Sequence, residues 1–325
     1  MKVVTVGTSE ICETLIAAFK QVGIEVFACV GRDEKRTSDF ALKVGVEYHA
    51  NDYDAVIKSD VFDTVYLAVP NSLHYEYAKK ALENGKNVIC EKPFTANLNQ
   101  AKELVMLASK NNLFLFDGIT TLHLLAYKQL REDLKLLGDI KNVVVSFYKV
   151  SSKIEKYKNN EECSAFSYKT CGGALMDLGV YNIAFAVGLF GLPKAVKYHP
   201  NMEKGIDISG VSILKYDNFI VTSLAGKNAN MKNGFMISGE NGYISCDSPN
   251  SLFDSYTIHF NDGTVKERKY EGESAYFQEL IDFKSIADYK NIKRANEYIT
   301  MSLMYTKTLD ELRKSAGIEF KADKN

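Results

Sequence analysis

The first third of the chain alternates between two hydrophobic patterns. Short runs rich in β-branched residues predict buried strands, and the longer segments between them repeat apolar residues at helical spacing. The strand candidates are residues 3–6, 26–30, 64–69, 87–90 and 113–116, and the helix candidates are residues 11–22, 33–44, 74–84 and 97–111. This alternation predicts βαβ units and a doubly wound parallel sheet.

After residue 118 the pattern changes. Helical segments at 124–137 and 174–189 flank a strand candidate at 142–147 and a polar loop at 151–170. Strand candidates then follow one another across short turns, at residues 195–199, 210–216, 219–224, 234–238, 243–246, 255–260 and 264–270. Such a succession predicts an antiparallel sheet, which is followed by helices at 274–287 and 295–315. We expect an α/β protein with an N-terminal Rossmann doubly wound domain (1–118) and a C-terminal α+β domain (119–325).

Composition and charge narrow the class of ligand. The chain has 325 residues, with 40 Lys and Arg against 41 Asp and Glu, and a formal net charge of -1. A chain this close to neutrality lacks long-range attraction to phosphate backbones or anionic lipid. We therefore expect a small-molecule ligand, with no nucleic-acid partner and no membrane partner.

The cysteines and histidines show no metal-binding or disulfide pattern. The six cysteines form no C-x-x-C pair, and the five histidines show no H-x-x-H or H-E-x-x-H spacing. This distribution predicts reduced cysteines and no metal site. No apolar run approaches the ~18 residues of a membrane span, so we expect a cytoplasmic protein.

A candidate dinucleotide turn follows the first strand. A dinucleotide-binding fold places G-x-G-x-x-G here, because a tight turn and a helix N-terminus must approach the pyrophosphate. This chain keeps only the first glycine, and the candidate binding residues are Gly7, Thr8, Ser9, Glu10 and Ile11. The alternative is an ordinary strand-to-helix turn capped by Ser9.

The end of the second strand bears on the choice between NADP and NAD. An acidic residue there binds the ribose hydroxyls of NAD, whereas an arginine accommodates the 2′-phosphate of NADP. This chain has Gly31, Arg32 and Asp33 at this place, with Arg36 nearby. Arg32 favours NADP, and Asp33 keeps NAD open. Alternatively, Arg32 is a solvated surface charge and Asp33 is a helix N-cap.

Three later blocks carry the most specific signal. They read VYLAVPNSLH (residues 65–74), ALENGKNVICEKP (81–93) and GGALMDLGVY (172–181). Together they resemble the Gfo/Idh/MocA family, and especially its dihydrodiol dehydrogenase-like branch, and the likeness covers nearly the whole chain. The resemblance implies an NAD(P)-dependent oxidoreductase that transfers a hydride between nicotinamide and a hydroxyl or carbonyl carbon of a sugar, polyol or cyclic diol.

The resemblance assigns catalytic roles to Lys92, Asp177 and Tyr181. Lys92 would donate to a substrate oxygen and stabilise a phenolate, and Tyr181 would exchange the hydroxyl proton. Asp177 lies four residues before Tyr181 on a predicted helix face and would bind substrate or orient Lys92 or Tyr181. The structural alternatives are a surface lysine paired with Glu91, a hydrogen-bonded helix carboxylate and a packed tyrosine.

The remaining candidate cofactor-binding residues surround the middle blocks. They are Val69, Pro70, Asn71, His74, Glu91 and Lys92. By resemblance, Pro70, Asn71 and His74 lie under the nicotinamide ribose, and the bond before Pro93 is cis. Asn71 is also a candidate cap for the helix that begins near His74.

The resemblance also bears on the second domain. The loop at 151–170 would form a wall of the substrate pocket, and the large open sheet would be a dimerisation surface, giving a homodimer or a dimer of dimers. Gly118 and Ile119 stand where many relatives have Glu-Ala, and Tyr181 stands where many have His, so the substrate stays open. Alternative functions are a glycosidase-like reaction on tightly held NAD and a dinucleotide-binding sensor without chemistry. Retention of all three catalytic candidates argues against the sensor.

Overall fold

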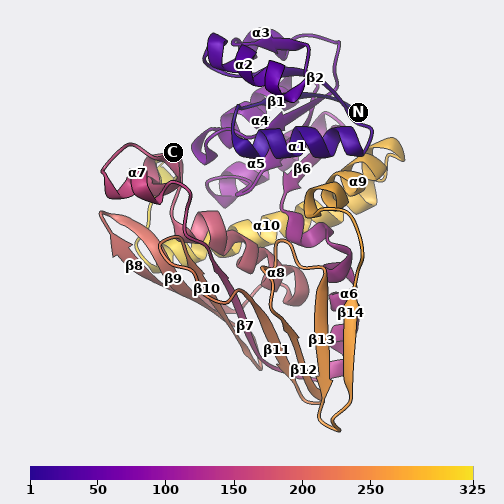
Figure 1. Cartoon of the computed structure of the whole chain (residues 1–325), viewed down its shortest axis with the longest axis vertical. Coiled ribbons are helices and arrows are strands. Elements are labelled where there is room, and N and C mark those ends of the chain that lie inside the picture. The colour runs from indigo at the N-terminus through magenta and orange to yellow at the C-terminus, as the bar shows by residue number, and fades with distance from the viewer. Residues whose placement is uncertain (325) are drawn as a thin grey trace. The chain divides into compact units, whose positions relative to one another are not determined.

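The computed structural model of the chain describes residues 1–324 and is shown in Figure 1. The chain divides into two compact units. The first contains Met1–Gly118 and Tyr276–Leu303, and the second contains Ile119–Ala275 and the described residues from Met304 onward. Each unit is organised around a sheet of its own.

The first unit is built on a six-stranded parallel sheet, which confirms the predicted doubly wound architecture. The strands are β1 (Lys2–Val6), β2 (Glu25–Val30), β3 (Tyr48–Ala50), β4 (Thr64–Leu67), β5 (Asn87–Glu91) and β6 (Leu115–Gly118). Their order is β3-β2-β1-β4-β5-β6, so the winding reverses between β1 and β4. Ligands of such sheets bind beside this reversal, at the carboxyl ends of the strands.

Helices cover both faces of this sheet. Alternate residues of β1 point to opposite faces, so apolar residues of one strand contribute to the core on each side. The helices of this unit are α1 (Glu10–Gln21), α2 (Glu34–Val44), α3 (Tyr53–Val56), α4 (His74–Glu83), α5 (Leu98–Lys110), α9 (Ala275–Asp288) and the first part of α10 (Ile292–Ser315). Val4 and Val6 share one apolar core with α3, α4 and α5. Val3 shares a second core with α1, α2 and α9.

Helix α9 belongs to the first unit although it follows the second unit in sequence. Phe283 of α9 stacks on Phe116 of β6 with ring centroids 4.6 Å apart, and Leu280 is fully buried in the same core. This segment was expected in the C-terminal domain with the rest of 119–325. In the structure, Tyr276–Leu303 instead belongs to the first unit, because Leu280 and Phe283 of α9 pack in one of its apolar cores and Leu303 of α10 packs against the other.

The second unit is built on an eight-stranded sheet of order β14-β13-β12-β11-β7-β10-β9-β8. The strands are β7 (Ile140–Tyr148), β8 (Ala195–Glu203), β9 (Ile206–Lys215), β10 (Ile220–Gly226), β11 (Gly234–Gly239), β12 (Gly242–Cys246), β13 (Ser255–Phe260) and β14 (Val265–Lys269). Neighbours β7 and β10 run parallel, and the other neighbouring pairs run antiparallel. The predicted mostly antiparallel sheet is confirmed.

The two faces of this second sheet differ. One packs on helix α8 (Val180–Phe190), visible beside the sheet in Figure 1, where Phe185 lies with its ring centroid 4.7 Å from that of Phe235 on β11. The other leaves apolar side chains in solvent: Val144, Ile220 and Met236 are 41%, 44% and 51% exposed. Val144 and Met236 are cross-strand partners, so they are neighbours on this open face.

The connections of the chain contain shorter helices. In the second unit these include α6 (Leu125–Asp133) and α7 (Ile154–Lys158). Single 3-10 turns occupy Asn71–Leu73, Thr120–His123, Leu134–Leu137, Ser164–Phe166, Tyr168–Thr170 and Lys321–Lys324. The segment at 151–170, expected as a polar loop, therefore contains α7 and two 3-10 turns, and Tyr157 and Phe166 are buried in it.

One helical segment, Tyr168–Phe190, is long and apolar enough to cross a membrane by length and composition. This corrects the expectation that no apolar run reaches that length. In the structure, 67% of its most apolar stretch is buried inside the protein. Buried core helices pass the same test, so the finding is weak evidence for a membrane span.

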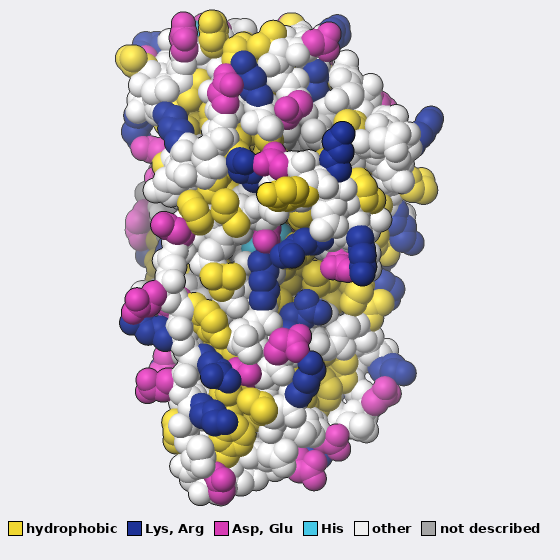
Figure 2. Space-filling model, turned by 90° about the vertical axis from the view of Figure 1, so that its right-hand side faces the viewer, with side chains coloured by type: hydrophobic (Ala, Val, Ile, Leu, Met, Phe, Trp, Pro, Cys, Tyr) yellow, Lys and Arg dark blue, Asp and Glu magenta, His cyan; other side chains and the backbone are white. Residues whose placement is uncertain are grey.

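Surface charge is mixed in sign. Figure 2 shows Lys and Arg side chains beside Asp and Glu side chains over much of one face. Ion pairs such as Lys79 with Glu103, whose charged atoms are 2.6 Å apart, link such side chains. Any positive potential that holds an anionic ligand therefore has to be local.

Candidate active site

The turn between β1 and α1 depends on glycine at position 7. Gly7 has a φ of 127°, which favours glycine, and a Cβ there would lie 2.5 Å from the carbonyl oxygen of Ala68. Ser9 occupies the N-cap of α1, but its side chain makes no capping hydrogen bond. The capped turn considered as an alternative is therefore not formed. The first N–H groups of α1 are left for an anion to bind.

The other candidate residues of this turn, Thr8, Glu10 and Ile11, lie after Gly7, up to and within the first turn of α1. Thr8 follows Gly7, and Glu10 and Ile11 open α1. At a helix N-terminus the backbone N–H groups point outward along the axis, whatever the side chains are. A pyrophosphate at this end would meet backbone donors first.

The first turn of α2, which follows β2, is tied to the turn after β1 by Arg36, whose Nη2 donates to the carbonyl oxygen of Thr8 at 3.3 Å. Asp33 caps α2, and its Oδ1 accepts from the Arg36 backbone N–H at 2.8 Å. The N-cap alternative for Asp33 is thus what the structure shows. Arg32 is exposed, and a Cβ at Gly31 would lie 2.3 Å from a side-chain oxygen of α2.

His74 joins two loops at the carboxyl edge of the sheet. Its Nδ1 lies 2.9 Å from the carbonyl oxygen of Pro93, and its Nε2 lies 3.0 Å from that of Val69. Burial lowers the pKa of His74, and the two carbonyl contacts oppose that shift. Because both ring nitrogens face protein carbonyls, the side chain positions the loops at Val69–Pro70 and Lys92–Pro93. The residue directly before α4 is Leu73, not Asn71.

Glu91, the last residue of β5, and Lys92, which follows it, lie in different environments. Lys92 is partly exposed, and its bond to Pro93 is cis, as the resemblance implied. Glu91 is buried, and its Oε1 accepts a hydrogen bond from the Tyr66 hydroxyl at 2.9 Å. Burial raises the pKa of Glu91 to about 7, while nearby Lys92 opposes the shift. Of the two neighbours, Lys92 is the one with access to a ligand.

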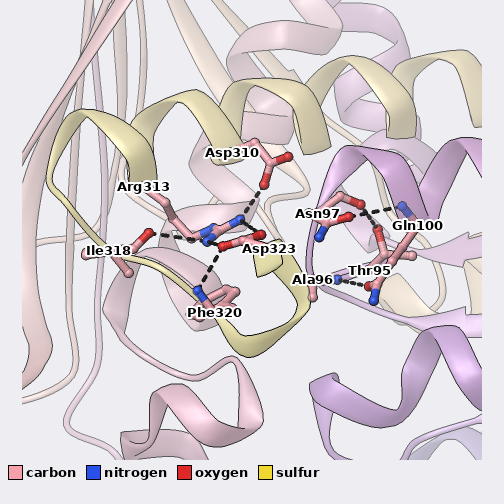
Figure 3. Close-up of polar contacts among 9 residues, drawn as sticks. All are labelled: Thr95, Ala96, Asn97, Gln100, Asp310, Arg313, Ile318, Phe320 and Asp323. Carbon is pink, nitrogen blue, oxygen red and sulfur yellow. Dashed lines mark hydrogen bonds and ion pairs between the residues drawn. The ribbon is translucent and has the colours of Figure 1, made fainter. Parts of the chain in front are cut away.

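The loop after Pro93 is held by the start of α5, drawn in Figure 3. The Asn97 side-chain oxygen accepts from the Gln100 N–H at 3.0 Å, and Gln100 Oε1 accepts from the Ala96 N–H at 3.2 Å. The Thr95 hydroxyl donates to the Asn97 carbonyl oxygen at 2.8 Å. This reciprocal cap fixes the chain directly after Lys92 and Pro93.

In the second unit, Asp177 and Tyr181 do not share one regular helix. Asp177 lies in a π-helical turn, Leu175–Gly179, and Tyr181 lies in the first turn of α8. The expected continuous α-helix is corrected here, because the wider turn inserts i→i+5 hydrogen bonds. The Tyr181 ring packs near Phe147 of β7, with centroids 5.6 Å apart.

Gly173 and the buried carboxylate of Asp207 lie at the start of this turn. A Cβ at Gly173, which has a φ of 109°, would lie 2.0 Å from Asp207 Oδ1. Asp207 is 2% exposed and accepts hydrogen bonds from the Leu175 N–H and the Tyr198 hydroxyl, both at 2.8 Å. It also accepts from the Tyr168 hydroxyl at 3.1 Å. Burial raises the pKa of Asp207, and these donors oppose the shift. Sequence reasoning missed Asp207, which looks like an ordinary strand residue.

A second missed residue is Lys227, which directly follows β10. Its Nζ lies 2.8 Å from Asp177 Oδ2 and donates to the Ala165 carbonyl oxygen at 2.5 Å. The Lys227 side chain is 1% exposed, whereas that of Asp177 is 35% exposed. No motif marks this lysine, because its partner comes from a distant segment of the chain.

The C-terminal segment packs against the turn at Tyr168–Thr170. Arg313 Nη1 lies 2.7 Å from Asp323 Oδ2, and its guanidinium also pairs with Asp310 (Figure 3). The guanidinium carbon lies 4.1 Å from the ring centroid of Phe320, whose ring is 5.9 Å from that of Tyr168. The described end of the chain thus packs beside the 3-10 turn that contains Tyr168.

Comparison with known proteins decides the family. Residues 1–119 match an oxidoreductase family with an NAD-binding Rossmann fold, and residues 127–245 match the Gfo/Idh/MocA C-terminal domain. The chain is 30% identical to scyllo-inositol 2-dehydrogenase (NADP(+)) IolU of Bacillus subtilis, over 98% of each chain. The chain belongs to the Gfo/Idh/MocA oxidoreductase family. The resemblance found in the sequence blocks is confirmed.

Further similarity supports this placement of the oxidoreductase. The trans-1,2-dihydrobenzene-1,2-diol dehydrogenase of Bos taurus is 26% identical over 93% of this chain and 91% of its own. The fold matches the crystal structure of KijD10, a 3-ketoreductase from Actinomadura kijaniata in complex with NADP and TDP-benzene. That match has a TM-score of 0.83 and 22% identity and covers 97% of each chain.

The residues of the first unit fit the cofactor of this Gfo/Idh/MocA oxidoreductase. Gly7 leaves space where a Cβ would clash, and α1 presents N–H groups that Ser9 does not cap. The protein is an NAD(P)-binding oxidoreductase of the Rossmann class. Among residues 1–324, no group of three or more His, Cys, Asp or Glu side chains could hold a metal ion.

Proposed function

We propose that this oxidoreductase interconverts a CH–OH group and a carbonyl of an uncharged polyol, sugar or cyclic diol, with NADP preferred over NAD. The observation that carries the proposal is the Leu175–Tyr181 segment. It places a partly exposed carboxylate, Asp177, one turn before a partly exposed phenol, Tyr181. An acceptor beside a proton carrier suits a substrate with neighbouring hydroxyl groups.

In the proposed mechanism, bound nicotinamide supplies the hydride acceptor or donor. Tyr181 Oη takes the proton of the reacting hydroxyl during oxidation and returns it during reduction. Lys92 Nζ donates to the substrate oxygen and favours the phenolate by its positive charge. Asp177 accepts a hydrogen bond from a substrate hydroxyl and fixes the orientation of the carbon that reacts.

The preference for NADP is proposed from the end of β2. Asp33, the acidic residue that would bind the ribose hydroxyls of NAD, is engaged as the cap of α2. Arg32 and Arg36 lie beside it, and Arg36 already reaches the cofactor turn. The NADP dependence in the name of the Bacillus subtilis relative agrees with this preference.

The test is a panel of polyols, sugars and trans-dihydrodiols with NADP and NAD in parallel, followed by nicotinamide absorbance. We expect net NADP reduction with at least one polyol or diol. Lys92→Ala and Tyr181→Phe should each lower turnover about 100-fold or more. Tyr289→Phe, at a side chain that is 82% exposed, is the matched control and should leave turnover unchanged. Tight cofactor binding without turnover, or turnover without net absorbance change, would contradict the proposal.

We further propose a homodimer formed through the open face of the second sheet. The exposed side chains of Val144, Ile220, Met236 and Tyr243 lie on that face, and self-association would remove them from water. Sedimentation should show a dimer or a dimer of dimers for the native chain. Combining Val144→Lys with Met236→Lys should give monomers, and a native chain that sediments only as monomer would contradict the proposal.

A cytoplasmic location is proposed from the cysteines. All six are free thiols in the structure, and five of them are buried. Disulfides persist mainly in oxidising compartments, so thiols agree with a reducing one. Cell fractionation with a periplasmic or secreted marker as control tests the location, and co-fractionation with that marker would contradict it.

A further inference from the structure

Lys227 is buried to a degree unusual for its residue type. Its side chain is 1% exposed, and lysine is almost never fully buried unless its charge is paired. The partner is Asp177 Oδ2 at 2.8 Å. The ammonium also donates to the Ala165 carbonyl oxygen at 2.5 Å and lies 4.3 Å from the ring centroid of Phe166. Its charge is thus balanced by a carboxylate that the proposed mechanism uses.

The two partners differ in their access to solvent. Asp177 is 35% exposed, so a ligand can reach its carboxylate, whereas Lys227 lies behind it and cannot be reached. A cation within about 4 Å favours the ionised form of a carboxylate and holds its orientation. Lys227 therefore acts on a ligand only through Asp177.

The same ammonium connects Asp177 to the wall of the pocket. Phe166 stacks on Tyr157 with centroids 4.4 Å apart, and both pack with Ile206 and Ile208 in one buried cluster. Movement of this wall would remove the Ala165 carbonyl and the Phe166 ring from Lys227. The position of the wall and the orientation of Asp177 are therefore coupled through one side chain.

We infer that Lys227 is a positioning residue for the reaction, which keeps Asp177 an ionised and oriented acceptor for a substrate hydroxyl and couples it to the wall at Ser164–Phe166. The inference rests on the proposed function. It also narrows the substrate class, since a carboxylate or phosphate group placed at Asp177 would be repelled, whereas a hydroxyl would be bound. An uncharged polyol meets this requirement.

Lys227→Met tests the inference, because methionine keeps an unbranched apolar side chain and removes the charge. The matched control is Lys86→Met: Lys86 is also buried, donates to the Ser59 and Phe62 carbonyl oxygens, and lies over the Phe62 ring, but pairs with no site carboxylate. We expect Lys227→Met to lower kcat/KM about 10- to 100-fold and to move its acid limb to higher pH. The acid limb of Lys86→Met should stay in place.

Combining Lys227→Met with Asp177→Asn separates positioning from a merely structural role. If Lys227 acts through Asp177, adding Lys227→Met to Asp177→Asn changes kcat/KM by less than about twofold. Two losses that multiply independently, or an acid limb that does not move in Lys227→Met, would overturn the inference.

Carbon-13 NMR titration of the aspartate carboxyls keeps the inference testable if the proposed function fails. In Lys227→Met the Asp177 resonance should titrate at higher pH than in the native protein, whatever the substrate. An unchanged Asp177 titration overturns the inference. Absence of turnover by the native protein across the panel overturns the proposed function alone.

Discussion

The two units carry candidate functional groups of different kinds. In the first unit the candidate cofactor site is mainly backbone, namely a turn that requires Gly7, N–H groups at the start of α1 and loops tied together by His74, and Lys92 adds a charged side chain. The second presents charged side chains held by other charged or polar side chains, as Asp177 is by Lys227. A site built from main-chain groups tolerates most side-chain substitutions but not the replacement of a required glycine. A site built from side chains depends on partners that are distant in the sequence.

This difference explains why the functional residues of the first unit are easier to predict from the sequence than those of the second. A glycine turn after a strand is local, so its chemistry is visible in a few consecutive residues. A buried ion pair joins residues that only the fold brings together, so neither partner can be predicted from the sequence around the other. Substitutions in each unit can test this contrast.

Gly173→Ala should destabilise the second unit most strongly. The new Cβ would meet Asp207 Oδ1 at 2.0 Å at a φ of 109°, so the cap of the π-helical turn must shift. We expect a loss of about 3–4 kcal/mol in the free energy of unfolding, measured by urea denaturation. Gly205→Ala is the control, since its φ is also positive, at 78°, but nothing lies within 4 Å of its Cβ. Equal losses for the two would show that Asp207 is not the cause.

Glu91→Gln should change how stability depends on pH. The carboxyl of Glu91 titrates at about 7 in the fold against 4.5 ordinarily, so the folded state holds its proton more tightly. Native stability must then fall as pH rises from about 4.5 through 7, by on the order of 3 kcal/mol from this group. Burial and nearby Asp117 raise the pKa of Glu91, whereas Lys92 and the Tyr66 hydroxyl lower it, and Glu91 in turn raises the pKa of buried Glu279.

In the Glu91→Gln variant that decline should be smaller. Thermal unfolding between pH 4 and pH 8 measures it, with Glu83→Gln on the exposed end of α4 as control. A variant whose unfolding curve follows the native pH dependence would show that Glu91 is ionised throughout.

Gly7→Ala should weaken cofactor binding through the backbone alone. Its Cβ would lie 2.5 Å from the Ala68 carbonyl oxygen, so the turn must open. We expect the Kd for NADP to rise about 30-fold, measured by fluorescence titration, corresponding to about 2 kcal/mol. Ser9→Ala removes only a hydroxyl that does not cap α1 and should change Kd less than about threefold. The reverse ranking would mean that side chains, not backbone, hold the pyrophosphate.

Arg36→Ala should have the smallest effect, on the choice of cofactor. The guanidinium joins α2 to the Thr8 carbonyl oxygen, and under the proposed preference for NADP it would attract the 2′-phosphate. We expect the ratio of kcat/KM for NADP to that for NAD to fall about tenfold, near 1.4 kcal/mol. Lys35→Ala, on the same helix and paired with Asp39, should leave the ratio unchanged. A ratio unaffected by Arg36→Ala would leave Arg32 as the candidate.

The architecture of both sheets could be predicted from the sequence, because the burial of one or both faces of a strand determines the spacing of its apolar residues. β1, with Val3 on one face and Val4 and Val6 on the other, shows the alternation of a strand covered on both sides. The same reasoning missed the place of α9. An apolar helix face shows that something covers it, but not which sheet does, and Phe283 meets Phe116 only in the folded chain.

The two-sheet organisation, the family and the turn at Gly7 could be predicted from the sequence, because each depends on patterns among residues near one another in the chain. The polar pairings required the folded chain: Asp33 caps a helix, both ring nitrogens of His74 contact carbonyl oxygens, and Lys227 pairs with Asp177. Burial makes a polar group need a hydrogen-bonding or charged partner, and the fold selects which partner is within reach.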